Sequence, residues 1–288
     1  MSHNSANVRF LPGSSFDLDF LADLYTQTFA EYFYPCLVTT EDLAEWVRVE
    51  HLDLDRCPVM LVDEKPAGFA TVGIRGEKAY CKGFGVIVSH RGRGLAHNLC
   101  GEMVRIAGQA GARRMTLGVI KHNTRAVETY RKAGFQLRRE LVSIEWRADT
   151  DYAGQPPLDG SAREITEARP ADLLAHFDDL HAIEPIWNRD LPSLREINNL
   201  EGLAAVSDGV PEAYVLFEAA GGTTVIVDLA ARPGARPAKL LANVLWKLRE
   251  KHPHVICHNE PADNPLLPVM LDTGFRETVR RLELERVF

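Results

Sequence analysis

Residues 86–96, Val-Ile-Val-Ser-His-Arg-Gly-Arg-Gly-Leu-Ala, constrain the fold of this chain more than any other stretch. They combine the end of an apolar strand, a short basic loop with two glycines, and the start of an amphipathic helix. Gly92 and Gly94 allow a tight turn and a close approach of a ligand to the backbone. The amides that follow lie unpaired at the positive end of the helix. The stretch therefore predicts a phosphate or pyrophosphate site, with Arg91 and Arg93 adding positive charge.

Two common glycine loops do not fit this stretch. A nucleoside-triphosphate loop ends in Gly-Lys-Ser or Gly-Lys-Thr, whereas Gly94 is followed by Leu-Ala. A dinucleotide-binding turn places its glycines directly after the strand and an acid about 20 residues later. Here three residues separate Val88 from Gly92, and no acid stands near Ala110. The pattern Arg91-x-x-Gly94-x-Ala96 instead resembles the acyl-CoA loop of the GNAT acetyltransferase superfamily; a plain glycine turn before a helix is the alternative.

A second motif follows a strand predicted at residues 115–120. Residues 123–135 resemble the GNAT signature Asn-x-x-Ala-x-x-x-Tyr-x-x-x-Gly-Phe, through Asn123, Ala126, Tyr130, Gly134 and Phe135. Asn is a good N-cap, positions four apart share one helix face, and Gly suits a left-handed C-cap. Two motifs in the family's order make chance an unsatisfactory explanation. The resemblance covers roughly residues 7–148.

The resemblance implies a site for acetyl-CoA and a role for each matched residue. Tyr130 is expected to act as the general acid that protonates the departing thiolate. The cofactor-binding residues implied are Val86, Ile87, Val88, Arg91, Gly92, Arg93, Gly94, Leu95, Ala96, Asn123, Ala126 and Tyr130. The simpler alternatives are that Tyr130 is a packed aromatic residue and that Asn123 is only a helix cap.

Residues 79–88 predict a strand whose side chains alternate between two faces. One face takes Tyr80, Lys82, Phe84, Val86 and Val88. The other carries Gly83 and Gly85, which leave room for something to lie against the backbone. In the GNAT family this strand splays from its neighbour, and the resemblance implies that Val86 and Val88 offer backbone groups to the pantetheine arm. A bulged strand that happens to contain glycine is the alternative.

Length and charge set the class of protein. A chain of 288 residues is long enough for two domains with cores of their own. Its formal charge of −7 makes nucleic acid an unsuitable partner. No segment approaches the roughly 20 apolar residues of a membrane span, and no signal peptide is recognisable. The five cysteines lack metal-ligand spacing, so we expect no metal, reduced thiols and a cytoplasmic location.

The chain is organised as a repeat. A polar linker at residues 149–162 separates a first domain, residues 1–148, from a second, residues 163–288. Both end in Gly-Phe followed by a strand. We therefore expect an α+β protein of two tandem GNAT folds in a mycothiol-synthase-like arrangement. Each fold has a mixed, mostly antiparallel central sheet flanked by helices, with a splayed central strand pair.

The second copy departs from both motifs. Aligned on the first loop, Pro233 stands for Arg91, Arg236 for Gly94 and Pro237 for Leu95, and proline has no amide to donate. Counting back from Phe275, Met270 stands where Tyr130 stands, and a thioether cannot donate a proton. We expect the second domain to be structural or to complete the acceptor pocket.

The acceptor side is less well defined. Residues 29–36, Phe-Ala-Glu-Tyr-Phe-Tyr-Pro-Cys, offer rings and one carboxylate for an amine pocket, or simply pack at a helix end. Glu31 is the candidate base, with Tyr80 and His122 as others; a proton relay to water needs no base.

These features together predict the activity. We expect acetyl transfer from acetyl-CoA to a small-molecule amine by direct attack, in a monomer or homodimer. The alternatives are a non-catalytic acyl-CoA sensor or scaffold, and an acetyltransferase for protein N-termini or lysines.

Overall fold

The computed structural model describes residues 7–149 and 165–288, with only the backbone for residues 235–238. The chain divides into two compact units. Unit 1 holds the described residues up to Arg138 together with Leu282–Phe288, and unit 2 is Arg139–Arg281. The predicted linker lies outside the described residues, except for its first position, Asp149.

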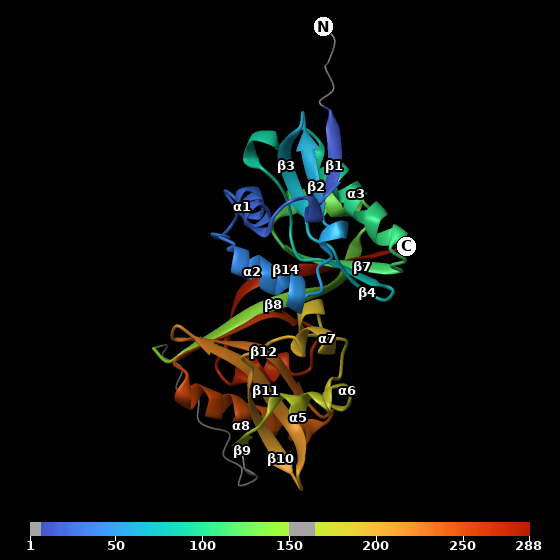
Figure 1. Cartoon of the computed structure of the whole chain (residues 1–288). Helices are drawn as coiled ribbons and strands as arrows, with labels where there is room; N and C mark the ends of the chain where they lie inside the picture. The colour runs from blue at the N-terminus through green and yellow to red at the C-terminus, as the bar shows by residue number, and fades with distance from the viewer. Residues whose placement is uncertain (1–6, 150–164) are drawn as a thin grey trace. The chain divides into compact units, whose positions relative to one another are not determined.

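Unit 1 is built from two sheets with helices packed on them (Figure 1). Its elements are β1 (Val8–Pro12), α1 (Leu18–Thr28), α2 (Thr40–Val49), β2 (Pro58–Val62), β3 (Lys65–Ala70), β4 (Gly73–Arg75), β5 (Lys78–Cys81), β6 (Phe84–Val86), α3 (Leu95–Gln109), β7 (Arg114–Ile120), α4 (Thr124–Lys132) and the start of β8 (Gln136–Arg147). One sheet has the order β1-β2-β3-β6 and is antiparallel. The other has the order β4-β5-β7-β14, with β5 and β7 parallel.

The helices of unit 1 begin where the sequence supplies caps. The Asp17 carboxylate accepts from the Phe20 amide at 2.8 Å at the start of α1. Thr39 and Asp42 form a reciprocal capping box at the start of α2. β2 follows α2 along the chain and is an apolar strand that is buried along its whole length. Caps and apolar strands thus agree locally, which favours a single packing for this unit.

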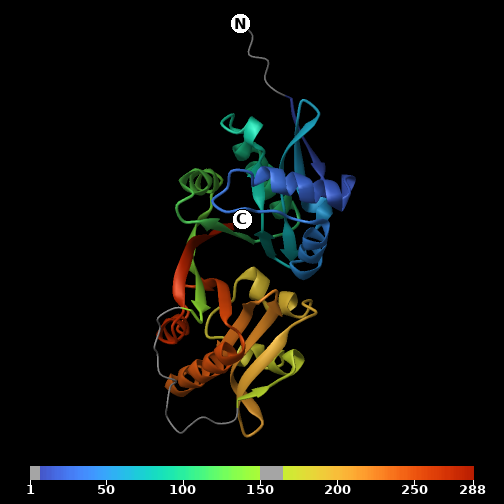
Figure 2. The ribbon, with the colours of Figure 1, turned by 90° about the vertical axis from the view of Figure 1, so that its left-hand side faces the viewer.

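Unit 2 is a sheet covered by helices on both faces (Figure 2). Its elements are β9 (Ile165–Glu167), α5 (Pro170–Leu174), α6 (Phe177–Leu180), α7 (Leu191–Leu194), β10 (Glu201–Ser207), β11 (Val210–Ala220), β12 (Thr223–Ala231), α8 (Ala235–Lys251), β13 (His254–Pro261), α9 (Leu267–Asp272) and β14 (Arg276–Val287). Residues of α8 and α9 share one buried cluster with the sheet, and residues of α5, α6 and α7 share another.

The two compact units do not coincide with the two halves of the sequence. Residues 141–147 of β8 pair antiparallel with β13 in unit 2. Leu282–Phe288, which contain the last part of β14, belong to unit 1, where β14 is the neighbour of β7. Leu284 is only 1% exposed within the core of unit 1. The sheet of each unit therefore contains strand residues from both sides of the predicted linker.

The expected splay of the central strands is confirmed. β5 pairs with β7 from Lys78↔Arg114 to Cys81↔Leu117, and there the pairing stops. β6 continues the same stretch of chain but pairs with β3. The strands β6 and β7 therefore diverge, which leaves one edge of β6 without a neighbouring strand in the described part of unit 1.

Candidate functional site

The N-terminus of α3 differs from those of α1, α2 and α4. Those three helices begin with a side-chain cap, from Asp17, Thr39 and Asn123 respectively. The N-cap of α3 is Gly94, which has φ = 77° and supplies no side chain. The amide of His97 donates to the Gly94 carbonyl at 2.9 Å. The amides of Leu95 and Ala96 precede it and have no acceptor within the helix.

The space beside this loop is open. A Cβ added to Gly92 or Gly94 would meet no atom within 4 Å, and both have a positive φ that favours glycine. The first turn of α3 carries no acidic residue, and Arg93 is exposed. The loop therefore offers uncapped amides, positive charge and open space, which are the features of an anion site.

Arg91 anchors the loop to α1. Its Nε donates to the Val86 carbonyl at 2.9 Å. Its Nη2 donates to the carbonyls of Thr28 and Ala30 at 3.0 and 2.9 Å. The side chain thus keeps its charge beside the loop, but its hydrogen bonds serve to fix the loop against the end of α1.

The predicted alternation along residues 79–88 is wrong beyond Lys82. Lys82 lies over the Trp46 ring of α2 at 4.4 Å. A Cβ on Gly83 would collide with the Tyr25 ring of α1, so the next residue faces the same side. Phe84 then packs on Tyr130 of α4. Two successive residues on one side are the mark of a bulge, and every later side chain changes face.

The two glycines of this strand make room for α1 and not for a ligand. A Cβ on Gly85 would lie 2.6 Å from the Thr28 Cβ, and one on Gly83 would overlap Tyr25. The expectation that this face is left open for a ligand is therefore wrong. The physical reason is that α1 packs closely on β5 and β6, which the bulge bends and which we call the bent strand.

Gly83→Ala is expected to lower the free energy of unfolding by about 1–3 kcal/mol, because the added methyl overlaps a buried ring. Gly101→Ala is the matched control. It adds the same methyl on α3, where no atom lies within 4 Å, and should stabilise by about 0.5–1 kcal/mol. Urea denaturation of both variants measures the difference; equal stabilities would contradict the packing role of Gly83.

The unpaired edge of β6 presents the backbone of Val86. The Gly83 carbonyl accepts from Thr71 at 2.8 Å and the Ile87 amide donates to Ala67 at 2.9 Å, so these groups face β3. Groups of the residues between alternate to the other edge. The Val86 amide therefore points away from β3, toward the splay. Val88 does not extend the strand as predicted, because it begins a 3-10 turn at Val88–His90.

Tyr130 is held inside unit 1 with its hydroxyl unused. The side chain is 6% exposed, and its ring packs edge-on to Phe84 and Phe135 with centroids 5.5 and 5.9 Å away. The hydroxyl has no hydrogen-bond partner among the described residues. Burial, more than the nearby cysteines, raises the pKa of Tyr130 well above its ordinary value. The phenol is thus neutral and able to donate a proton.

Asn123 caps the helix that carries Tyr130. Its side-chain oxygen accepts from the Ala126 amide at 3.3 Å, which confirms the predicted N-cap. Gly134 follows the helix with φ = 88°, which confirms the left-handed C-cap. Both ends of α4 are therefore set by residues of the second motif.

The aromatic segment, residues 29–36, forms a chain of ring contacts. Tyr32 packs edge-on to Phe29, Phe33 and Tyr34 at 5.1–5.3 Å. Phe33, 52% exposed, packs on His122 at 4.8 Å. The segment therefore runs from the carbonyls bound by Arg91 to the residue before Asn123.

The base candidates are spread out within unit 1. Glu31 is exposed, has φ = 62° and makes no hydrogen bond or ion pair among the described residues. His122 is exposed beside Phe33, whereas Tyr80 is half-buried on β5. Of these three candidates, Glu31 belongs to the aromatic segment itself, and His122 packs on its Phe33.

A buried ion pair on the α2 side of the bent strand is missed by the sequence. Glu50, the C-cap of α2, is 4% exposed and pairs with Lys82. The one sign of this ion pair in the sequence is Lys82, a lysine within an otherwise apolar predicted strand. Its partner is 32 positions away, and only the packing of α2 brings the two together.

Unit 1 offers no activated thiol among its buried cysteines. Burial raises the pKa of Cys57 and of Cys100 to about 12, and raises that of Cys81 further. These thiols stay protonated at neutral pH. In the described ranges no cluster of three metal-ligating side chains occurs, and no helix there is both long and apolar enough to span a membrane.

Unit 2 repeats the backbone of both motifs. The Phe275 amide donates to the Met270 carbonyl at 3.2 Å, as Phe135 donates to Tyr130 at 3.0 Å. α8 begins after Gly234, as α3 begins after Gly94. The predicted alignment of this loop is therefore wrong by two residues, because Gly234 and not Arg236 takes the N-cap position.

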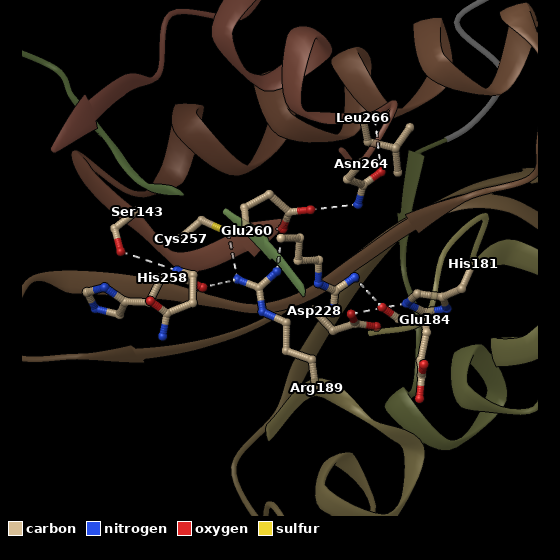
Figure 3. A network of polar contacts seen from close by, with 12 residues as sticks. Ser143, His181, Glu184, Arg189, Asp228, Cys257, His258, Glu260, Asn264 and Leu266 are labelled. Carbon is tan, nitrogen blue, oxygen red and sulfur yellow. Dashed lines mark hydrogen bonds and ion pairs between the residues drawn. The ribbon is translucent and has the colours of Figure 1, made fainter. Parts of the chain in front are cut away.

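A buried polar network lies where β12 and β13 diverge (Figure 3). Arg189 donates to the Cys257 Sγ at 2.9 Å, to the His258 carbonyl at 2.6 Å and to Glu260. Arg189 and Glu260 are 5% and 1% exposed. Nearby, Asp228 accepts from Tyr214 at 2.7 Å. Charged groups that satisfy one another thus fill this splay of unit 2.

Residues 18–135 match the model of the Acetyltransferase (GNAT) family. Over this segment the chain is similar to the GNAT acetyltransferases. The matched segment runs from α1 to the end of α4 and contains both motifs and the splay of unit 1. The match of this segment supports acyl-group transfer as the activity. A comparison with curated proteins finds no match.

Solved structures share the fold of this chain over almost its whole length. A tandem GNAT protein from the clavulanic acid biosynthesis pathway has a TM-score of 0.69 at 14% identity, covering 98% of each chain. A GCN5-related N-acetyltransferase from Sphaerobacter thermophilus has a TM-score of 0.66 at 15% identity, covering 97% of this chain and 95% of its own. At these identities the likeness concerns the fold, and its extent is consistent with two GNAT folds.

Proposed function

We propose that unit 1 transfers an acetyl group from acetyl-CoA to the amine of a small molecule. The observation that carries this proposal is that unit 1 contains three sets of groups without a hydrogen-bond partner of their own among the described residues. They are the uncapped amides after Gly94, the free edge of β6 at Val86, and the unpartnered phenol of Tyr130. A diphosphate, an extended amide arm and a leaving thiolate need these same kinds of group.

The residues of unit 1 would divide the work as follows. Acetyl-CoA supplies a thioester, whose carbonyl carbon the amine attacks directly. The loop amides and Arg93 hold the diphosphate, and the Val86 amide polarises the thioester carbonyl. Tyr130 gives its proton to the sulfur as the carbon–sulfur bond breaks, which prevents the thiolate from reversing the step.

The amine must also lose a proton. We propose Glu31 as the group that receives it, because it is an exposed carboxylate in the aromatic segment next to Ala30, whose carbonyl Arg91 binds. Direct release to water is the alternative. The aromatic segment is proposed to face the acceptor.

Unit 2 is proposed to be structural. The Arg189 network fills its splay, and Met270 stands in the place of Tyr130. We also propose that the protein works in the cytoplasm, since its described cysteines are free thiols.

Calorimetric titration of the full chain with acetyl-CoA tests the proposal, with stoichiometry as the first result. We expect one molecule per chain. Two per chain would contradict the structural role of unit 2. Absence of binding would overturn the acyl-CoA site.

Release of the CoA thiol is then measured across a panel of small amines and lysine peptides. Turnover with a small amine supports the proposed acceptor class. Turnover with peptides alone would favour a protein acetyltransferase, and binding without any turnover would favour a sensor.

A further inference from the structure

The end of the chain reaches the helix that carries Tyr130. Arg286, on the part of β14 that belongs to unit 1, donates from Nη1 to the Ala133 carbonyl at the C-cap of α4. A Cβ on Gly134 would overlap that guanidinium. Gly134 therefore serves two purposes, a left-handed C-cap and an opening for Arg286.

The contact suits a cation. The last carbonyls of a helix lack internal donors and carry the negative end of the helix dipole, so a guanidinium there both donates and neutralises. The Nε of Arg286 is buried with no hydrogen-bond partner in the described part of the chain. Its guanidinium also lies 5.5 Å from the Phe288 ring. The Arg286 guanidinium contacts Ala133 although its Nε makes no hydrogen bond to a described residue. Its other contacts must therefore hold it in this position.

Tyr130 belongs to the same helical turn. Its carbonyl accepts from the Ala133 amide at 3.0 Å and from the Phe135 amide at 3.0 Å. Loss of the Arg286 hydrogen bond to the Ala133 carbonyl would therefore also make the backbone of Tyr130 more mobile. The ring, packed between Phe84 and Phe135, would then shift relative to the edge of β6.

We propose that Arg286 is a positioning residue for Tyr130, so that the final strand of the chain sets the geometry of proton donation in unit 1. The inference rests on the proposed function. A misplacement of about 1 Å costs on the order of 100-fold in rate even when the group itself is intact.

The test combines Arg286→Met with Tyr130→Phe in a double-mutant cycle. Arg286→Met is expected to lower kcat at least about tenfold, with KM for acetyl-CoA within about twofold of wild type. In the Tyr130→Phe background the same change should alter kcat by less than about twofold, because the group it positions is absent. Arg286→Lys, which keeps the charge, should restore most of the activity.

Arg280→Met is the matched control. Arg280 lies on the same strand, and its ion pairs with Glu277 and Glu140 are exposed, so kcat should not change. Arg286→Gln repeats the cycle if the Met variant does not fold. Equal losses in both backgrounds would show a general structural role and overturn the inference while leaving Tyr130 as the acid. Unchanged turnover in the Tyr130→Phe single variant would overturn the positioning role of Arg286 and the role of Tyr130 as the acid.

Discussion

Tyr130→Phe lowers kcat by about 100-fold and leaves the dissociation constant of acetyl-CoA within about twofold of wild type. The change deletes one hydroxyl that has no hydrogen-bond partner among the described residues, whereas the ring keeps its contacts with Phe84 and Phe135. Steady-state kinetics with the best acceptor amine gives kcat, and calorimetric titration gives the affinity.

Tyr25→Phe is the control for this variant. Tyr25 is as deeply buried on α1, and burial raises its pKa as it does for Tyr130, but it faces the other side of the bent strand. We expect no change in kcat. A loss of affinity in Tyr130→Phe as large as the loss of turnover would assign Tyr130 to packing of the cofactor and remove its role as acid.

The assignment of Tyr130 as the general acid also predicts how kcat depends on pH. The protonated phenol is the active form, and burial raises its pKa, so donation persists at higher pH than for an exposed tyrosine. The ionisation of Tyr130 should therefore cause no loss of kcat below about pH 10, the ordinary pKa of a tyrosine. A falling limb near neutral pH that disappears in Tyr130→Phe would contradict the raised pKa.

Gly94→Glu raises the dissociation constant of acetyl-CoA at least about 100-fold. The new carboxylate would stand at the N-cap of α3, where a diphosphate is expected, and two unit charges about 4 Å apart near a surface repel by about 4 kcal/mol. Titration of the purified variant with acetyl-CoA measures the change.

Two control variants separate the effect of the added negative charge from the effect of backbone strain at Gly94. Gly101→Glu adds the same charge to the exposed face of α3, and should leave the affinity unchanged. Gly94→Asn adds a neutral side chain that tolerates the φ of 77°, and should weaken binding less than Gly94→Glu. Wild-type affinity in Gly94→Glu would show that the loop does not hold the cofactor.

The elements that follow from local chemistry could be predicted. Gly94 and Gly134 sit at helix ends with positive φ, and Asn123 caps α4, because caps and left-handed turns depend on the few residues that form them. The splay of the central strands could be expected only through the resemblance to the GNAT family, since strand pairing is not a local property.

The sequence pattern of the bent strand could not predict which side of the strand each side chain faces. Alternation along residues 79–88 is a sound rule for a regular strand, but one bulge after Lys82 inverts it. The bulge is recognised only when α1 and α2 are in place, because the contacts of Tyr25 with Gly83 and of Trp46 with Lys82 define which side each residue faces.

Local sequence thus determines the glycine loop, the capped helix with Tyr130 and the repeated Gly-Phe turns, because each depends on neighbours within a few positions. Only the tertiary structure decides that Leu282–Phe288 complete unit 1, that Arg286 reaches Ala133, and that Arg189 fills the splay of unit 2. The hydrogen bonds of Arg189 and Arg286 join residues 68–153 positions apart. They form because buried polar and charged groups need partners, and only the fold brings those partners close.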